Sequence, residues 1–277
     1  MIGILAFEFF RNAIFAGILA SIACGIIGTY VVVKRMVSVS GGISHAAFGG
    51  IGIGYFLGID PIYGAFAFTT GVAVFMSILK EKAQQNLDTI IAAMWAAGMA
   101  TGIIFIALTP GYTPDLFSFL FGNILLVPTS DLVIMVLLVI VILVLVGLFH
   151  LQLMAVTFDE EYAEVMNIPV TWLSLLLLLL VALTVVMLIR IVGIILVIAL
   201  LALPAAIARE FSGHLTHVML LSTGFGLVFT MGGLWLSYVL DVPSGATIIL
   251  LATAGYAVML AIKKIQRDKS QLPATSE

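Results

Sequence analysis

His45 is the only histidine that lies deep inside an apolar stretch of this sequence. A polar ring inside a membrane helix is costly, so such a residue is by default a candidate for function, and neutral imidazole is a good ligand for transition metals. On a helix, Gly41 and Gly49 share one face with His45, and we expect them to leave open space on either side of the ring. The glycines between 49 and 54 predict close approach by neighbouring helices. The alternative is a packing role, in which the ring is hydrogen-bonded to a backbone or serine group.

A polar group of another kind stands between two long apolar stretches, where the chain reads Phe158-Asp-Glu-Glu-Tyr162. Charged residues make up 9% of the sequence and hydrophobic residues 63%, so this acidic turn must face water. The sequence contains no Gly-Lys-Ser/Thr phosphate-binding loop, no His-Glu-x-x-His metal site and no cysteine cluster. We therefore interpret the segment 158–169 as a surface to which another protein binds. We also predict that the chain is not itself an enzyme.

Gly193 and Pro204 are the residues at which we expect the apolar helices to bend. Pro204 lacks a backbone N–H, so it predicts a kink of the kind that suits a moving wall of a pore. Asp88 is expected to cap the start of a helix, with a role in lining a metal exit path as the alternative. His214 and His217 are three residues apart, a spacing that permits weak metal binding, but we interpret both as solvated.

Apolar stretches long enough to cross a membrane recur from one end of the sequence to the other, and the charged fraction is too low to cover a soluble surface. The predicted fold is therefore all-α: a polytopic transmembrane helix bundle of about nine membrane segments, within a range of roughly eight to ten. One transmembrane domain at 1–267 and a short polar tail at 268–277 are expected. The segments are predicted at 7–33, 43–58, 61–79, 88–108, 132–149, 172–189, 192–209, 217–239 and 244–263. Of these, 43–58 and 192–209 are close to the minimum length for a crossing, so whether they cross fully stays open.

Nine of the 11 Lys and Arg residues fall on the same side of these segments, and the positive-inside rule makes that side cytoplasmic. The nine are Lys34, Arg35, Lys80, Lys82, Arg209, Lys263, Lys264, Arg267 and Lys269. The other two, Arg11 and Arg190, fall on the outer side. This distribution predicts a cytoplasmic C-terminus, places the acidic segment 158–169 in the cytoplasm and leaves the loop 109–131 outside.

Six segments occur in an order that resembles one protein family. They are Ile43-Ser44-His45-Ala46, Leu120-Phe-Gly-Asn-Ile-Leu125, Phe158-Asp159 with Tyr162-Ala163 and Ile168-Pro169, Val192-Gly193, Ala199-Leu-Leu with Leu203-Pro204-Ala205, and Asp241-Val-Pro-Ser-Gly-Ala-Thr247. Each is short, but the ordered set extends over nearly the whole chain. In this set the chain resembles the membrane permease of ATP-binding-cassette importers for divalent transition metals, the zinc, manganese and iron uptake group. The resemblance implies a fold like that of type II importer permeases.

The same resemblance implies a multi-pass protein of a prokaryotic cell membrane that forms the pore subunit of an ATP-driven importer. Its implied partners are a second copy of itself, two copies of a cytoplasmic ATP-binding-cassette ATPase, an extracytoplasmic metal-binding protein and the lipid bilayer, with no nucleic acid among them. The binding protein is expected to dock near 109–131 and 240–246. A divalent transition metal ion is then the substrate, no cofactor is bound permanently, and ATP is bound in the partner ATPase.

Particular residues also receive roles from the resemblance. The segment 158–169 corresponds to the family's cytoplasmic coupling helix, which docks in a groove of the ATPase. The predicted coupling residues in it are Phe158, Asp159, Glu160, Glu161, Tyr162, Ala163, Ile168 and Pro169. His45 becomes the candidate on the metal translocation path, and Gly193 and Pro204 remain the candidates for a kink or gate.

One departure from the family's pattern concerns the metal site. Many members carry an aspartate four residues before the histidine, where this chain has Gly41. A second ligand then has to come from the other protomer, another helix or a backbone carbonyl, so the metal and its full ligand set stay open. The alternatives are a permease of the same architecture for metal chelates such as siderophore or cobalamin, and an ion-coupled secondary transporter. The latter needs paired carboxylates in the membrane, which are essentially absent from the predicted segments.

Overall fold

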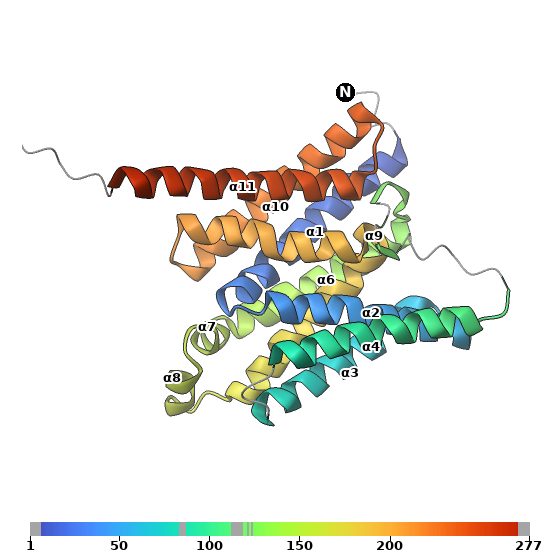
Figure 1. The fold of residues 1–277 in the computed structure, drawn as a ribbon, viewed down its shortest axis with the longest axis horizontal. Coiled ribbons are helices and arrows are strands. Elements are labelled where there is room, and N and C mark those ends of the chain that lie inside the picture. The colour runs from blue at the N-terminus through green and yellow to red at the C-terminus, as the bar shows by residue number, and fades with distance from the viewer. Residues whose placement is uncertain (1–6, 83–86, 112–118, 121, 123, 271–277) are drawn as a thin grey trace, which may run out of the picture.

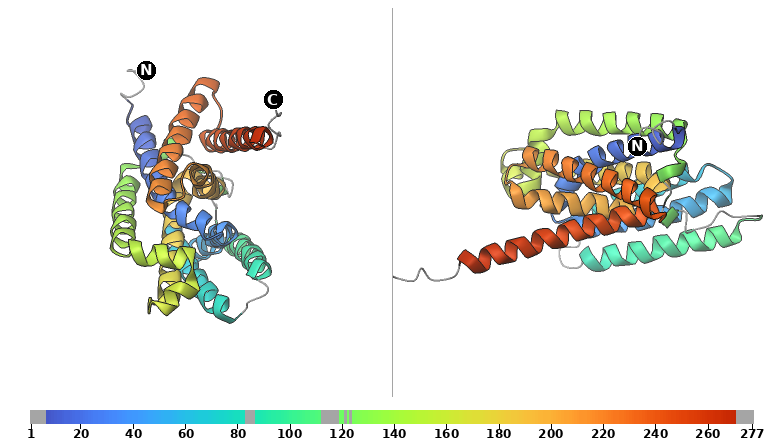
Figure 2. Two further views of the ribbon diagram at one scale, coloured as in Figure 1. Left: turned by 90° about the vertical axis from the view of Figure 1, so that its left-hand side faces the viewer. Right: turned by 90° about the horizontal axis from the view of Figure 1, so that it is seen from above.

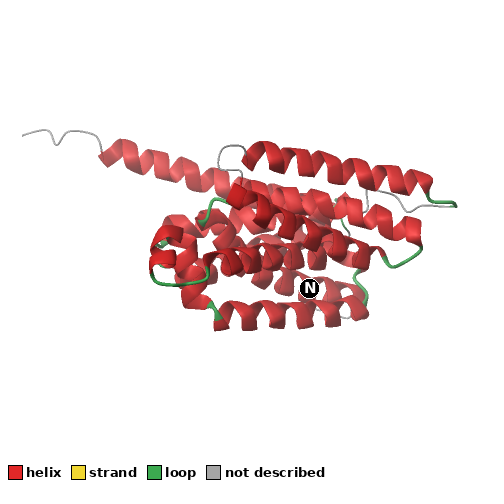
Figure 3. Ribbon diagram, turned by 90° about the horizontal axis from the view of Figure 1, so that it is seen from below, coloured by secondary structure: helices red, strands yellow, loops and turns green. Residues whose placement is uncertain are grey.

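The computed structural model describes residues 7–270 except 83–86, 112–118, 121 and 123, and every regular element in the described residues is a helix (Figures 1 and 3). The helices are α1 (Glu8–Val33), α2 (Val37–Leu57), α3 (Pro61–Lys82), α4 (Leu87–Leu108), the short 3-10 helix η1 (Ile124–Leu126), α6 (Thr129–Leu148), α7 (His150–Phe158), α8 (Glu160–Val165), α9 (Val170–Phe211), α10 (Leu215–Leu240) and α11 (Ser244–Ser270). The predicted all-α bundle is confirmed.

Eight segments of these helices are long and apolar enough to cross a membrane, and each matches a predicted span to within a few residues. They are Glu8–Val33, Pro61–Leu79, Asp88–Leu108, Thr129–Leu148, Val170–Ile189, Ile191–Phe211, Leu215–Leu240 and Ser244–Gln266. The ninth predicted span, 43–58, lies within α2, a helix of 21 residues that begins at Val37. Glycines, serines and His45 interrupt its apolar residues and α2 is not among those eight, yet its length is sufficient for a crossing.

The predicted spans 172–189 and 192–209 are the two halves of one helical run, α9, which is broken at Gly193. The backbone there has φ 77° and ψ 162°, a combination that glycine adopts without the steric cost of a side chain. The chain turns back at this point, so that the two halves of α9 cross the bundle in opposite directions (Figure 1). Pro204 lies in the second half, where the run contains no further non-helical residue.

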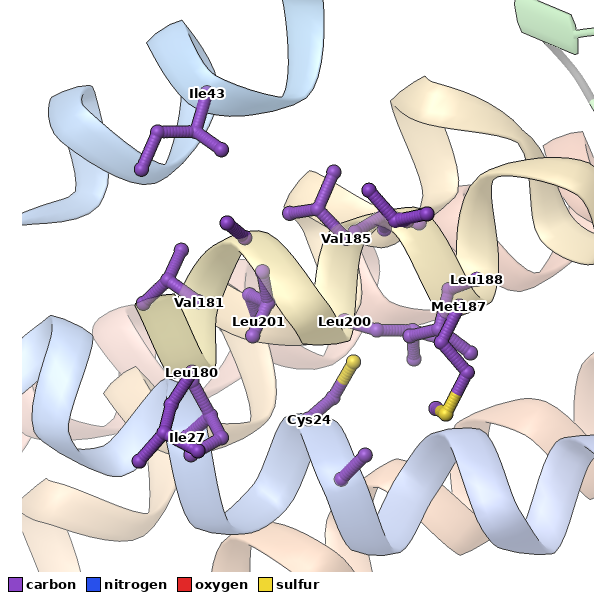
Figure 4. Close-up of a cluster of buried hydrophobic side chains, with 14 of the residues drawn as sticks. Cys24, Ile27, Ile43, Leu180, Val181, Val185, Met187, Leu188, Leu200 and Leu201 are labelled. Carbon is purple, nitrogen blue, oxygen red and sulfur yellow. The ribbon is translucent and has the colours of Figure 1, made fainter. Parts of the chain in front are cut away.

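The two halves of α9 form the centre of the bundle. Leu180 and Val185 from the first half and Leu201 from the second pack with Cys24 of α1 and Ile43 of α2, and all are almost completely buried (Figure 4). Cys24 is therefore a packing residue inside the core. The two halves of α9 therefore pack against α2, the helix that carries His45.

Helices at the edge of the bundle expose broad apolar faces. In both views of Figure 2, α6 lies on one side of the bundle, while α4 and α11 lie on the opposite side. Large side chains such as Ile104 of α4 (56% exposed) and Val258 of α11 (58% exposed) are uncovered in the single chain. Exposed apolar surface of this kind suits contact with lipid or with another protein in the membrane.

Candidate metal path and coupling site

His45 lies on the side of α2 that faces α4. Its imidazole stacks on the indole of Trp95, with ring centroids 4.0 Å apart and planes inclined by 12°. The Nδ1 atom is buried and has no hydrogen-bond partner within the described part of the chain. The nearby serine hydroxyls donate within α2 itself, from Ser40 to the Val37 carbonyl and from Ser44 to the Ser40 carbonyl, both at 2.8 Å. The packing alternative predicted a hydrogen bond from the ring to a backbone or serine group, and Nδ1 makes no such bond in the described residues.

The two glycines that share a face with His45 differ in their surroundings. A Cβ built on Gly41 meets no atom within 4 Å, so the expected open space exists on that side. A Cβ on Gly49 lies 2.9 Å from the carbonyl oxygen of Gly98 and 3.0 Å from the Phe68 ring, so the same expectation is wrong there. Gly49 is instead a contact residue between α2 and its neighbours.

The other glycines of α2 allow the close helix approach that was predicted. A Cβ on Gly50 collides with the backbone of Gly64 in α3, and one on Gly52 collides with the backbone of Gly102 in α4. Small residues are the usual means by which membrane helices come this close. The contacts fix α2 between α3 and α4 and so hold His45 opposite Trp95.

One chain alone does not assemble a complete metal site in its described residues. No three His, Cys, Asp or Glu side chains come together there in a way that holds a metal ion. His214 and His217 are exposed, as predicted, with ring centroids 5.7 Å apart. As a metal ligand His45 would therefore offer a single imidazole, and further ligands would have to come from outside this set.

Asp88 lies in the first turn of α4 and not at its N-cap, because the helix already begins at Leu87. A carboxylate in the first turn is stabilised by the helix dipole, so the physical reason for its placement is close to the predicted one. Asp88 also lines a cavity of about 240 Å³ with Lys34, Met36 and Glu160. The cavity lies between the start of α2 and the acidic segment, where the predicted exit path would end.

The acidic segment forms the short helix α8 between α7 and α9. Asp159 caps it, since its carboxylate accepts a hydrogen bond from the Tyr162 N–H at 2.9 Å. Phe158 and Tyr162 are 59% and 57% exposed, whereas Ala163 is fully buried against the bundle. The two aromatic residues among the predicted coupling residues are thus exposed, while Ala163 packs α8 against the bundle.

Lys34 connects this segment to the start of α2. Its Nζ lies 2.8 Å from Oε1 of Glu160 and donates to the carbonyl of Val156 at 2.9 Å. Lys34 stands at the end of α1, and the next residue, Arg35, has a left-handed backbone with φ 58°. From the sequence, Lys34 was only one of nine positive charges on the predicted cytoplasmic side. No local signal reveals a partner more than 120 residues away.

His150 was not singled out from the sequence, and it connects three helices at the same end. Its Nδ1 lies 3.5 Å from the Tyr30 hydroxyl and its Nε2 lies 3.3 Å from the Thr216 hydroxyl. These contacts make it a structural bridge between α1, α7 and α10.

The end of the bundle at which a binding protein is predicted to dock is described only in part. Residues 112–118, 121 and 123, within the predicted docking loop 109–131, lie outside the described residues. After them, Asn12 of α1 donates to the carbonyl of Val127 at 3.1 Å, which holds η1 against the bundle. The second predicted docking region, 240–246, is the turn between α10 and α11, where Asp241 has a left-handed backbone with φ 53°.

Comparison with known proteins relates this arrangement to a family of transporters. The ABC 3 transport family matches residues 6–263. A manganese transport system membrane protein, MntC, of Listeria monocytogenes is 34% identical over 251 residues, which are 91% of this chain and 89% of that protein. A probable metal transport system membrane protein of Chlamydia pneumoniae is 40% identical over 264 residues, 93% of this chain and 90% of that protein. The solved structure of PsaBC from Streptococcus pneumoniae in complex with Fab has a TM-score of 0.84 at 33% identity, covering 93% of this chain and 92% of that one.

Proposed function

The chain belongs to the ABC 3 transport family, and on this premise we propose that it is the membrane permease of an ATP-driven importer for manganese or another divalent transition metal ion. One observation carries the proposal: the likeness to a manganese transport membrane protein extends over 91% of the chain. The permease of a metal chelate, the main alternative, needs a wide pore without ligands, and His45 with its unpaired Nδ1 argues against it.

In this proposal the metal passes His45. The ring is held by Trp95, its Nδ1 lacks a protein partner within the described residues, and the space beside Gly41 is open. A pore ligand has to release what it binds, so a single imidazole with one or two further ligands suits passage better than a closed site. A second copy of the chain supplies the further ligands, and the exposed faces of α4 and α11 are the candidates for contact between the copies.

The energy comes from a separate chain. ATP is bound and hydrolysed by a cytoplasmic ATPase, present in two copies, which docks on α8 through the exposed aromatic side chains Phe158 and Tyr162. The side on which α8 and the end of α11 lie is cytoplasmic, in line with the distribution of Lys and Arg. An extracytoplasmic binding protein delivers the metal at the opposite end.

The test is reconstitution of the permease with its ATPase and binding protein in lipid vesicles. We expect Mn²⁺ to stimulate ATP hydrolysis and to accumulate inside the vesicles, and competition with Zn²⁺ and Fe²⁺ to rank the substrates. The His45→Ala variant should lose most uptake, while His214→Ala, which removes an exposed histidine, should retain it. Absence of metal-stimulated hydrolysis and uptake in the wild-type complex contradicts the proposal, and full uptake by His45→Ala favours the chelate permease.

A further inference from the structure

The indole of Trp95 covers one face of the His45 imidazole. Their centroids are 4.0 Å apart and the planes are almost parallel. One helical turn further along α4, Gly98 approaches the backbone of Ala46 so closely that a Cβ would not fit. The stack is therefore held between two helices in tight contact, and the ring of His45 has little freedom to turn.

The usual placement of tryptophan in membrane helices does not account for Trp95. Tryptophans gather at the membrane–water interface, where the indole N–H meets polar groups. Trp95 lies more than two helical turns inside α4, which begins at Leu87. Within the single chain 41% of its surface remains exposed, so it is not a buried core residue either. Its closest aromatic partner is the one side chain proposed to bind metal.

Stacking of this kind responds to the electronic state of the imidazole. A metal ion on a ring nitrogen withdraws electron density from the imidazole, whereas the face of an indole is electron-rich. Attraction between a positively charged group and an aromatic face is strongest for tryptophan. The stacked indole therefore favours the metal-bound ring over the free ring. It also closes one face of the ring, so that an ion approaches the nitrogens in the ring plane, where their lone pairs lie.

Building on the proposed function, we propose that Trp95 is a positioning residue for the transported metal: it fixes the plane of the His45 imidazole and strengthens the hold of that ring on a divalent transition metal ion. It does not contact the ion. Its contribution is to the affinity and geometry of a site whose ligand is His45.

Binding of radioactive Mn²⁺ to the full-length permease in lipid nanodiscs measures this contribution. Replacing Trp95 by leucine should weaken binding about tenfold, the size of effect expected for a cation over an indole face. Trp95→Phe keeps an aromatic face and should stay within about threefold of the wild type. Trp172→Phe and Trp235→Phe are the matched controls, because both residues are about half exposed and lie on other helices, and they should bind as the wild type does.

A spectroscopic measurement reports the contact itself, without any substitution at Trp95. The chain has three tryptophans, so the Trp172→Phe/Trp235→Phe variant retains Trp95 as its only one. Paramagnetic Mn²⁺ bound to the stacked imidazole should quench its fluorescence saturably, Mg²⁺ should not, and His45→Ala should abolish the saturable part.

The outcomes separate this inference from the proposed function. If His45→Ala lowers Mn²⁺ binding and vesicle uptake but Trp95→Leu binds as the wild type does, the role of Trp95 is wrong and the metal site stands. If Trp95→Phe binds Mn²⁺ as weakly as Trp95→Leu does, an aromatic face does not strengthen binding, and the proposed role of Trp95 is again wrong. If His45→Ala changes neither binding, quenching nor uptake, the assignment of His45 fails, and the role of Trp95 fails with it.

Discussion

The Nζ of Lys34 lies 2.8 Å from Oε1 of Glu160, and only 8% of the lysine side chain is exposed. The same ammonium group donates to the carbonyl of Val156 in α7. Three residues after Lys34 in the sequence, α2 begins at Val37 and leads to His45. The ion pair therefore joins the helix proposed to receive the ATPase to the turn that leads into the helix proposed to bind the metal.

Replacing Lys34 by methionine should uncouple transport from hydrolysis. Methionine keeps the apolar stem but removes the charge, and we expect the loss of this partly buried ion pair to cost about 1 kcal/mol, or roughly a fivefold effect. We expect Mn²⁺ uptake per ATP hydrolysed to fall by about that factor in reconstituted vesicles, with the complex still assembled. Lys263→Met, which breaks the ion pair with Glu210, is the control and should leave the ratio intact. An unchanged ratio for Lys34→Met refutes a coupling role.

Gly41→Asp should create a stronger metal site. The open space at Gly41 accommodates a side chain, and a carboxylate four residues before His45 lies on the same face of α2. Mn²⁺ binding should tighten by about tenfold or more, while transport slows because a tighter ligand set releases the ion less readily. Gly49→Asp has the same spacing on the other side of His45, but there the side chain meets α4, and that variant should misfold. Equal behaviour of the two variants contradicts the geometry described for α2.

Gly50→Ala should destabilise the bundle although it adds one methyl group. The new Cβ collides with the backbone of Gly64, so α2 and α3 have to separate, at a cost of about 1–3 kcal/mol. Thermal unfolding in detergent should show a lower midpoint for Gly50→Ala. Gly41→Ala should not lower the midpoint, because the space at Gly41 is open and alanine is a better helix former than glycine. A wild-type midpoint for Gly50→Ala means that the helices are less tightly packed than described.

Changing Phe158 and Tyr162 together to alanine should release the ATPase without unfolding the permease. Both side chains are more than half exposed, so their loss removes little internal packing, whereas aromatic anchors commonly dominate binding between proteins. We expect the amount of ATPase that copurifies with the permease to fall at least tenfold, at an unchanged unfolding midpoint. Phe211→Ala, another exposed aromatic residue, tests whether any such loss has this effect. Retention of the ATPase by the double variant refutes docking at α8.

The sequence was sufficient for the helices because membrane spans are encoded locally, in the length of an apolar stretch. The start of one span was nevertheless misplaced. The prediction began at residue 43, whereas α2 begins at Val37, because Ser38 and Ser40 make its first turns look polar. In the structure Ser40 donates to a carbonyl of its own helix, and so becomes compatible with a membrane environment.

The candidate site was predictable only where one residue carries the signal. His45 stands out because a histidine is rare in an apolar stretch, whereas Trp95 does not stand out among the apolar residues of α4. Gly41 and Gly49 are equivalent by spacing, and only the packing of Gly98 and Phe68 against α2 makes one side open and the other filled. Lys34 and Glu160 are likewise paired by the packing of helices distant in sequence.

The glycine contacts of α2 have a mechanical consequence. Backbone touches backbone both at Gly50 with Gly64 and at Gly52 with Gly102, so α2 cannot slide or rotate against α3 or α4 without severe overlap. We therefore expect the three helices to move together. We expect any opening of the pathway to displace these helices as a unit, and the left-handed backbone at Arg35, just before α2, marks where the unit joins α1.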